Sequence, residues 1–584
     1  MGNEPTIRGA NGWRPWLWLV VGALACLAEP AGAFPYIDTT GQGTTSGSTP
    51  LSAPDAQDLK HQLQLSNGLA ALGAGGGAGG GGWIIQPRVT VQEALTDNVL
   101  QVHSPMRWDL ITVLSPGISI TGATQRLQVR LDYAPVLIVN ARTGSQNALN
   151  QQLNATASVT VIPEFAFIDL RAVSGVQSLR GAAGAGGTIG AGDGGSLTAG
   201  TRTGIGNAGV AGSSQQSTVQ TASIGISPYL VQRFGDYGTA RLGYSLNLSQ
   251  ISPATGFQYI PFPTGTASQR LVTNEQTAQF RSGSFLNDFQ DTVDINFSQS
   301  TSSGRNTAIG SFLGNSSFAS TRQIFNNTLS YAVNRALTVT VSVGHENIIY
   351  TGSTLAPIND VTWSVGGTYT PNQNSSITIS YGHQLGTEAL SFNGYLQLTP
   401  RTSISASYSD TLGTQLENLQ NQLNQGVVGA NGGFVNRQTG GQLFGSTNNA
   451  PVQPGVYRFK TLTATATTQL NRDTVSLTLN SSTQTSAGGT AAFQGVSSQT
   501  NGAVIQWTRD LRPDMRLSTA ASYNVNTGGF SGTGQSIAFN TSLIYTLTDS
   551  VSASARYSFF KNTSQNALFS LVEDIFVVGI TKQF

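Results

Sequence analysis

The strongest constraint on the fold of this chain is a strict alternation of apolar and polar residues. Between 337 and 343, leucine and valine alternate with threonine and serine, and the same period of two recurs at 404–409, 475–480 and 551–557. Successive side chains of a β-strand point to opposite faces. Each segment is therefore expected to be a strand with one apolar face and one polar face.

The connections between the expected strands fall into two classes. Short turns rich in Asn, Asp and Pro, which supply the conformations that hairpins need, stand at 334–335, 371–372, 399–401, 471–473, 512–514 and 548–549. The opposite connections are long and rich in Gly, Ser, Asn and Gln, above all 175–217 and 411–455. Short turns on one side and long loops on the other are typical of bacterial outer-membrane barrels, whose short turns are periplasmic.

Following this pattern from Trp83 to Phe584 predicts an all-β fold, a transmembrane up-and-down antiparallel β-barrel of about 22 strands with short periplasmic turns and long extracellular loops. An even number places every tight turn on the side of both chain ends. The number depends on splitting one long segment at Ile162-Pro163-Glu164, so the expected range is roughly 20 to 24. A pair of soluble β-sandwiches is the alternative, and it leaves the one-sided loop lengths unexplained.

The composition favours a membrane barrel over a soluble or disordered protein. Charged residues are 10% of the chain, whereas soluble globular domains carry roughly 25%. Disorder usually needs high net charge and few aromatic residues, but the net charge is +1 and the chain has 25 Phe, 16 Tyr and 7 Trp. After residue 33 no apolar run is long enough for a transmembrane helix.

The first 33 residues have the layout of a signal peptide. Two arginines precede an apolar run over 16–27, and the small residues of 31–33 form an A-x-A cleavage site. Cleavage there removes Cys26, the only cysteine. The alternative is a lipoprotein box at 24–26 with Cys26 acylated. The expected organisation is a signal peptide over 1–33, a flexible periplasmic arm rich in Gly, Ser and Thr over 34–82, and the barrel over 83–584.

Aromatic residues indicate the membrane interfaces and an assembly signal. A tyrosine has an apolar ring and a polar tip, which suits the two interfaces, and tyrosines recur at strand ends: Tyr331, Tyr369, Tyr381, Tyr408, Tyr523, Tyr545 and Tyr557. The last strand ends on Phe584 and resembles the C-terminal signature that barrel assembly machinery reads, although Lys582 occupies a slot that is usually aromatic. Outer-membrane lipid and the barrel assembly machinery are therefore the expected partners.

Several short motifs lie in the first third of the predicted barrel: WIIQP at 83–87, TDN at 96–98, LSPG at 114–117, LDY at 131–133, the segment 165–170 and SPY at 227–229. Together they resemble an outer-membrane β-barrel family associated with exosortase/PEP-CTERM systems and exopolysaccharide loci. The resemblance implies the outer membrane of a Gram-negative bacterium. It also implies a part in making or exporting surface polysaccharide, with the polysaccharide and its export or synthesis components as partners. It supplies no catalytic residues.

Charged residues at expected inward positions gather in the first half of the barrel. They are Arg88, Arg126, Arg130, Asp132, Asp169, Arg171, Arg241, Glu275, Arg281 and Asp294, whereas inward positions of the second half are nearly all Ser, Thr, Asn or Gly. Two readings stay open. The charges form either a selectivity surface for a hydrated polymer or solute, acidic or not, or an internal network of ion pairs and hydrogen bonds that stiffens the barrel.

The longest loop contains leucines at helical spacing, Leu412, Leu416, Leu419 and Leu423. This spacing predicts a short amphipathic helix. Such a helix either caps or constricts the pore or folds the loop on itself.

No enzyme, cofactor or metal site is predicted. The four histidines, His61, His103, His345 and His383, lack ligand-spaced partners, and no Ser/His/Asp set can be assembled. The glycine-rich stretches lack the strand-turn-helix context of phosphate loops, and no nucleic-acid partner is expected.

The sequence thus predicts a porin-like outer-membrane channel, passive or gated, associated with exopolysaccharide biosynthesis or export. One alternative is a non-conducting structural or adhesion barrel that presents the long loops. Another is a TonB-type receptor, a class that shares barrels of about 22 strands. That class needs a folded plug, for which the segment 34–82 is too short.

Overall fold

The computed structural model describes residues 82–178, 218–253, 269–304, 318–372, 374–428, 434–436, 455–489, 497–529, 532–565 and 570–584. The predicted signal peptide over 1–33, the alternative acylation of Cys26 and the predicted arm up to residue 81 lie outside these residues. Trp83, where the barrel is expected to begin, is the first residue of the first strand.

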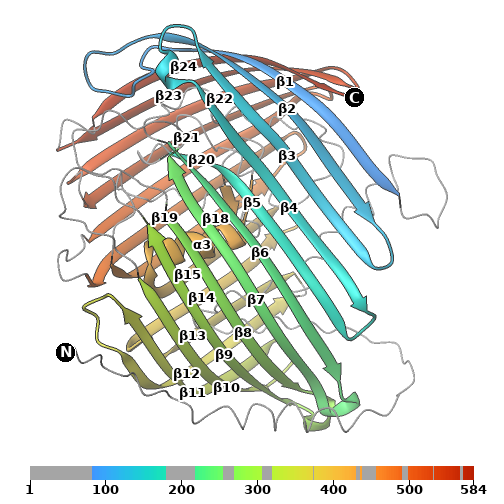
Figure 1. Cartoon of the computed structure of the whole chain (residues 1–584). Coiled ribbons are helices and arrows are strands. Elements are labelled where there is room, and N and C mark those ends of the chain that lie inside the picture. Colours follow the sequence, from blue (N-terminus) through green and yellow to red (C-terminus); the bar gives the residue numbers. More distant parts are fainter. Residues whose placement is uncertain are drawn as a thin grey trace, which may run out of the picture. The chain divides into compact units, whose positions relative to one another are not determined.

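The described residues are almost entirely β-sheet (Figure 1). The main sheet has 22 strands: β1 (Trp83–Thr96), β2 (Asp109–Ala123), β3 (Leu127–Asn140), β4 (Ala148–Ile162), β5 (Ala166–Ser178), β6 (Thr218–Arg233), β7 (Gly238–Pro253), β8 (Gln269–Ser282), β9 (Phe289–Gly304), β10 (Ala319–Ala332), β11 (Leu337–Thr351), β12 (Ile358–Asn372), β13 (Ser375–Gln384), β14 (Thr387–Thr399), β15 (Thr402–Thr414), β18 (Val456–Gln469), β19 (Asp473–Gly488), β20 (Ser498–Arg512), β21 (Met515–Gly528), β22 (Gly534–Thr548), β23 (Val551–Ser564) and β24 (Leu571–Gln583). The loop between β15 and β18 contains the helix α3 (Gln415–Gln425) and a small sheet of β16 (Gly426–Val428) and β17 (Phe434–Asn436). Short 3-10 turns are η1 (Gly144–Gln146), η3 (Gly235–Tyr237) and η4 (Ser284–Leu286).

The sheet closes on itself. Each strand pairs antiparallel with its neighbour along the chain, β15 pairs with β18 across the longest loop, and β1 pairs with β24 from Arg88↔Gln583 to Thr96↔Ile575. The split predicted at 162–164 is also present, because β4 ends at Ile162 and β5 begins at Ala166. The predicted antiparallel barrel is confirmed, and the soluble sandwich alternative is wrong.

The two ends of the barrel differ in their connections. At one end, short turns join the strands. In the turn after β10, the Asn334 side-chain oxygen accepts hydrogen bonds from the amides of Ala336 and Leu337 at 2.8 and 2.9 Å, the turn chemistry expected of Asn. The Phe584 amide donates to the Pro87 carbonyl at 3.0 Å at this same end. At the long-loop end one connection is short, since only 385–386 join β13 to β14.

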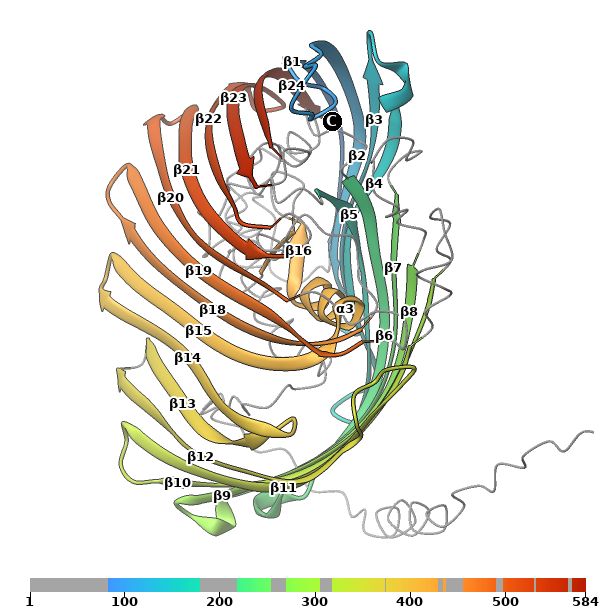
Figure 2. The same cartoon turned by 90° about the vertical axis from the view of Figure 1, so that its left-hand side faces the viewer.

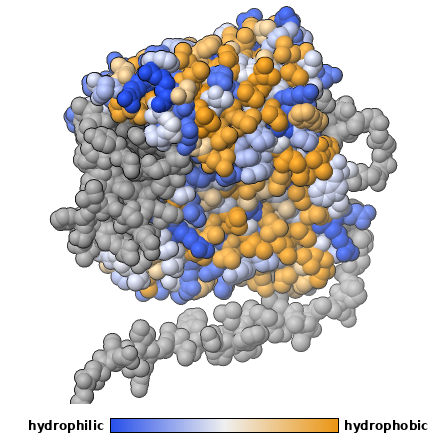
Figure 3. All heavy atoms as spheres, turned by 45° about the horizontal axis from the view of Figure 1, so that its top comes forward, coloured by the Kyte–Doolittle hydropathy of each residue, from blue (hydrophilic) through white to orange (hydrophobic). Residues whose placement is uncertain are grey.

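The outward face of the barrel is apolar. On β11, Val341 and Val343 are 45% and 55% exposed, and the residues between them belong to the polar inner face. Figure 3 shows apolar residues gathered over the outer surface of the strands. A wide exposed apolar surface is unfavourable in water and favourable against lipid hydrocarbon. This is the architecture of an outer-membrane-type barrel.

The seven tyrosines expected at the interfaces occupy outward positions in the strand register: Tyr331, Tyr369, Tyr381, Tyr408, Tyr523, Tyr545 and Tyr557. Three of them donate a hydrogen bond from the phenol to the next strand: Tyr381 to Glu388, Tyr523 to Gln535 at 3.0 Å and Tyr557 to Asp574 at 2.5 Å. An outward ring with its hydroxyl tied to a polar neighbour matches the demands of a membrane interface. The terminal Phe584 ring is 70% exposed and lies 5.2 Å from the Lys582 ammonium.

Candidate functional site

The helix α3 lies inside the barrel lumen, against the wall formed by β5 to β10 (Figure 2). It begins directly after β15, and its side chains and carbonyls contact strands of this wall in order along the helix. Ser320 of β10 donates to Glu417 at 2.5 Å, Thr273 of β8 donates to Gln420 at 2.7 Å, and Arg171 of β5 donates to the Leu423 carbonyl at 2.6 Å. The following strand β16 lies against β4 and β5. The pairing of β15 with β14 ends at Tyr408, and the Leu412 carbonyl is already bonded to Arg322 of β10 before the helix begins, so the helix follows the wall from β10 to β5.

Local sequence signals start this helix. The Thr414 hydroxyl accepts a hydrogen bond from the Glu417 amide at 3.1 Å, and the Glu417 carboxylate accepts one from the Thr414 amide at 2.8 Å. This reciprocal pair is a capping box, whose T-x-x-E pattern is readable in the sequence. The predicted helix in this loop is confirmed as α3, but Leu412 lies before the first residue of α3. Strand pairing of Leu412 with Arg458 carries β15 on to Thr414 before the helix begins.

Apolar contacts add to the docking of α3. Leu416 is 3% exposed and packs with Ile251 of β7 and Leu271 of β8, and the partly buried Leu419 lies against the same cluster. Leu423 is fully buried. The loop therefore does not simply fold on itself, because its leucines are buried against the barrel wall.

A buried arginine binds the end of β15, directly before α3. Arg322 of β10 donates hydrogen bonds to the Leu412 carbonyl and to the Tyr350 hydroxyl, and Tyr350 donates to the same carbonyl at 3.2 Å. Arg322 was not among the residues expected from the sequence. Its strand shows little apolar alternation around it, and its partner lies 90 residues away along the chain.

The charges expected on the inner wall divide into lumen-facing residues and one residue at the rim. The contacts to α3 identify the lumen side of each strand, and by strand register this side includes Arg88, Arg130, Asp132, Asp169, Arg171, Arg241, Glu275, Arg281 and Asp294. The inward position predicted for Arg126 is wrong. It is exposed in the turn between Ala123 and Leu127, because β2 and β3 both end before it and strand alternation does not extend into the turn.

Most of these lumenal charges have close partners. The two guanidinium nitrogens of Arg88 donate to the Asp132 carboxylate at 2.7 and 2.8 Å, a bidentate pair. Buried Glu275 accepts from Asn296 at 2.5 Å and Ser245 at 3.3 Å. Further partners come from the neighbouring strands: Ser158 donates to Asp169 at 2.8 Å, Gln279 to Asp294 at 2.8 Å and Arg281 to Gln290 at 2.9 Å, and the Arg241 guanidinium lies 4.4 Å above the Tyr229 ring.

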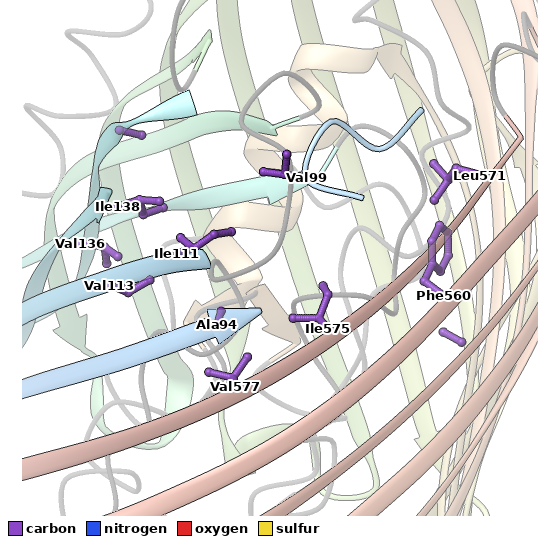
Figure 4. Close-up of a cluster of buried hydrophobic side chains, with 12 residues drawn as sticks. Ala94, Val99, Ile111, Val113, Val136, Ile138, Phe560, Leu571, Ile575 and Val577 are labelled. Atoms are coloured by element: carbon purple, nitrogen blue, oxygen red, sulfur yellow. The ribbon is translucent and has the colours of Figure 1, made fainter. Parts of the chain in front are cut away.

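A second loop also folds into the lumen, at the seam between β24 and β1. Inward apolar residues of β1, β24 and the strands on either side of them form one cluster with Val99 of the connection between β1 and β2 (Figure 4). The cluster comprises Ala94, Val99, Ile111, Val113, Val136, Ile138, Ala148, Ala538, Phe560, Leu571, Ile575 and Val577. Beside it, buried Glu573 accepts hydrogen bonds from Gln101 at 2.7 Å and Thr96 at 3.0 Å. Neither the inward apolar cluster nor Glu573 was predicted, because strand alternation assigns apolar residues to the outer face.

Among the described residues, no group of three His, Cys, Asp or Glu side chains is arranged to hold a metal ion. His383 lies 3.6 Å from the Asp360 carboxylate, and His61 is outside the described part of the chain. In the same described segments, no helix has the length and apolar character to cross a membrane.

Comparison with known proteins finds no matching family model and no matching curated protein. Among solved structures, the chain is similar to the ferric-catecholate import receptor Fiu of E. coli K12, with 9% identity, coverage of 86% of this chain and 82% of that one, and a TM-score of 0.47. It is also similar to the FrpB iron transporter of Neisseria meningitidis, with 10% identity, coverage of 85% and 82%, and a TM-score of 0.46. These similarities concern the barrel fold alone.

Proposed function

We propose that this protein is a gated outer-membrane channel for polar solutes that works with exopolysaccharide biosynthesis or export. The observation that carries the gating is the position of α3 inside the lumen, where it is docked on β10, β8 and β5. The apolar outer face supports the outer-membrane location. The resemblance of the short motifs at 83–87, 96–98, 114–117, 131–133 and 227–229 to exopolysaccharide-linked barrels supports the biological context.

A barrel of about 22 strands is wide enough for an aqueous lumen unless it is plugged. The helix α3 narrows this lumen, but much of its docking rests on single polar contacts and one buried leucine cluster. Local elements with few contacts open at lower free energy than the strands of a sheet. The ring of 22 paired strands is therefore the fixed part of the proposed channel, and α3 is the part that can move.

Planar-bilayer recording of the purified full-length protein tests the channel. We expect ion-conducting steps whose open fraction rises when residues 415–425 are replaced by a flexible segment of equal length rich in Gly and Ser. A matched replacement in the exposed turn at 333–336 should leave the open fraction unchanged. Absence of current both with α3 and without it would contradict the channel and favour a structural or adhesion barrel.

The TonB-type alternative predicts a different dependence. Uptake through such a receptor needs an energised inner-membrane partner, whereas passive permeation continues without a proton gradient. Solute permeation into cells or liposomes that persists after the gradient is collapsed supports the channel. For the biological context, deletion of the gene should reduce surface carbohydrate without loss of other outer-membrane proteins, and unchanged surface carbohydrate would refute that part of the proposal.

A further inference from the structure

One part of the inner wall is an ordered array of uncharged polar side chains. Four serines of β15 stand in register with four threonines of β18, which stand in register with a polar row on β19. We call this set the hydroxyl array; its members are Ser403, Ser405, Ser407, Ser409, Thr461, Thr463, Thr465, Thr467, Ser476, Thr478, Asn480 and Ser482. The opposite face of the same strands carries Leu462, Leu477 and Leu479, which are 42–49% exposed toward lipid. The array therefore faces the lumen.

An aromatic ring lies beside this array on the same face. Tyr395 of β14 is paired in register with Ser405, so it also points into the lumen, and it is 48% exposed. The neighbouring Asn393 is paired with Ser407. The inward rings Tyr457 and Phe459 of β18 are buried at the long-loop end, whereas the Tyr395 ring is half-exposed among polar side chains, so it is available to a ligand in the lumen. Aromatic rings bind the apolar faces of ligands that are polar at their edges.

The inward register positions around the array are uncharged, and the charged side chains of β15 and β18, Asp410, Arg458 and Lys460, pair with one another at the long-loop end. Within the described strands β13, β14, β15, β18 and β19, the inward positions hold no Asp, Glu, Lys or Arg. Lumenal charges lie instead on strands such as β1, β3, β5, β8 and β10, where they pair with one another, bond to neutral polar side chains or hold α3. A wall that selects an anionic polymer would instead present unpaired arginines or lysines to it.

We propose that Tyr395 and the hydroxyl array form a binding surface for an uncharged, polyhydroxylated solute, a neutral saccharide chain. This inference rests on the proposed channel and names its substrate class. Hydroxyl groups both donate and accept hydrogen bonds, so an array of them can follow the hydroxyls of a sugar in many orientations. The Tyr395 ring takes the apolar face of a sugar ring. Neutral hydrogen bonds are individually weak, which lets a chain move along the wall.

The test measures interruptions of ionic current by defined oligosaccharides. A neutral maltodextrin oligomer should block the open channel, and an oligogalacturonate of equal length should block it less. Tyr395→Leu should shorten the neutral block by roughly 3- to 10-fold, the effect of losing an aromatic contact, while Tyr395→Phe should retain most of it. Thr463→Val together with Thr465→Val should shorten the block by roughly threefold or more.

Thr468→Val is the matched control, because Thr468 lies on β18 but on its outer face. It should leave the neutral block unchanged. A longer block by oligogalacturonate than by maltodextrin, or equal block times in the wild type and Tyr395→Leu, would overturn the proposal.

Calorimetry of the full-length protein in detergent with the same maltodextrin separates this inference from the channel. Binding that depends on Tyr395 without any current would contradict the channel and support the saccharide surface. Current without maltodextrin binding or block would support the channel and refute the saccharide surface.

Discussion

Weakening the docking of α3 should open the channel, and the double substitution Leu416→Ala with Gln420→Ala isolates this effect. Leu416 is 3% exposed between Ile251 and Leu271, and Gln420 accepts the Thr273 hydrogen bond at 2.7 Å. Neither residue belongs to a barrel strand. The double variant therefore removes helix docking while leaving every strand pairing in place.

The size of the effect follows from these contacts. Truncating a buried leucine to alanine costs about 2–5 kcal/mol, and losing a neutral hydrogen bond costs about 0.5–1.5 kcal/mol. Both losses fall on the docked state of the helix only. A shift of about 3 kcal/mol changes the ratio of docked to undocked channels by roughly 100-fold.

Single-channel recording measures this ratio as closed to open time. A complementary variant, Thr273→Cys with Gln420→Cys, allows α3 to be tied to β8 by a short crosslinker that bonds to both thiols through disulfides, which should hold the channel closed until the disulfides are reduced. Tying the seam loop instead, through Gln101→Cys with Glu573→Cys, should leave the gating of α3 intact. An open fraction unaffected by both the double alanine substitution and the Thr273–Gln420 crosslink would refute α3 as the gate.

Three further outcomes are expected from the same structure. Arg130→Gln with Arg241→Gln should leave the cation-to-anion permeability ratio close to that of the wild type, because Arg130 interacts with the Asp132 carboxylate and the Arg241 guanidinium is held over the Tyr229 ring; a ratio shifted strongly toward cations would instead identify a selectivity surface. Phe560→Ala should lower the free energy of unfolding by about 3–5 kcal/mol, the cost of emptying a buried aromatic position, measured by urea titration of the folded band on gels, and an unchanged midpoint would show that the seam cluster adds no stability. Arg88→Ala should cost about 1 kcal/mol in the same titration, since the partner Asp132 is part-exposed and partly hydrated once alone, and Arg88→Ala in an Asp132→Ala background should cost measurably less.

The period of two was sufficient to predict the barrel because the outer face of every strand meets lipid. At Val341 and Val343, for example, lipid contact requires apolar residues at alternate positions. This requirement is local, so the sequence alone shows it. The turn residues predicted the positions of the hairpins. The Asn334 side chain, for example, accepts hydrogen bonds from amides only two and three residues away. Such short-range chemistry is readable without a structure.

The inner wall was less predictable because its contacts join distant parts of the chain. Arg171 meets the Leu423 carbonyl 252 residues later, and Gln101 meets Glu573 472 residues later. No local pattern records which strand a loop will cross. The capping box at Thr414 and Glu417 is the exception, since it predicts where the helix begins but not which strands the helix contacts.

The distribution of lumenal charge follows from what each wall must hold. Water in the lumen competes for the hydrogen bonds between α3 and the wall. The wall that holds the helix therefore needs strong, directional donors such as the guanidinium groups of Arg171 and the buried Arg322. The wall that a neutral solute follows needs the opposite, because a charge fixed there would bind water and ions more tightly than a sugar hydroxyl. One sheet can meet both demands only by segregating charge around its circumference. The inward positions of β5 to β10, which carry charge, and those of β13 to β19, which do not, fit the proposed channel, in which α3 docks on one wall and the solute follows the other.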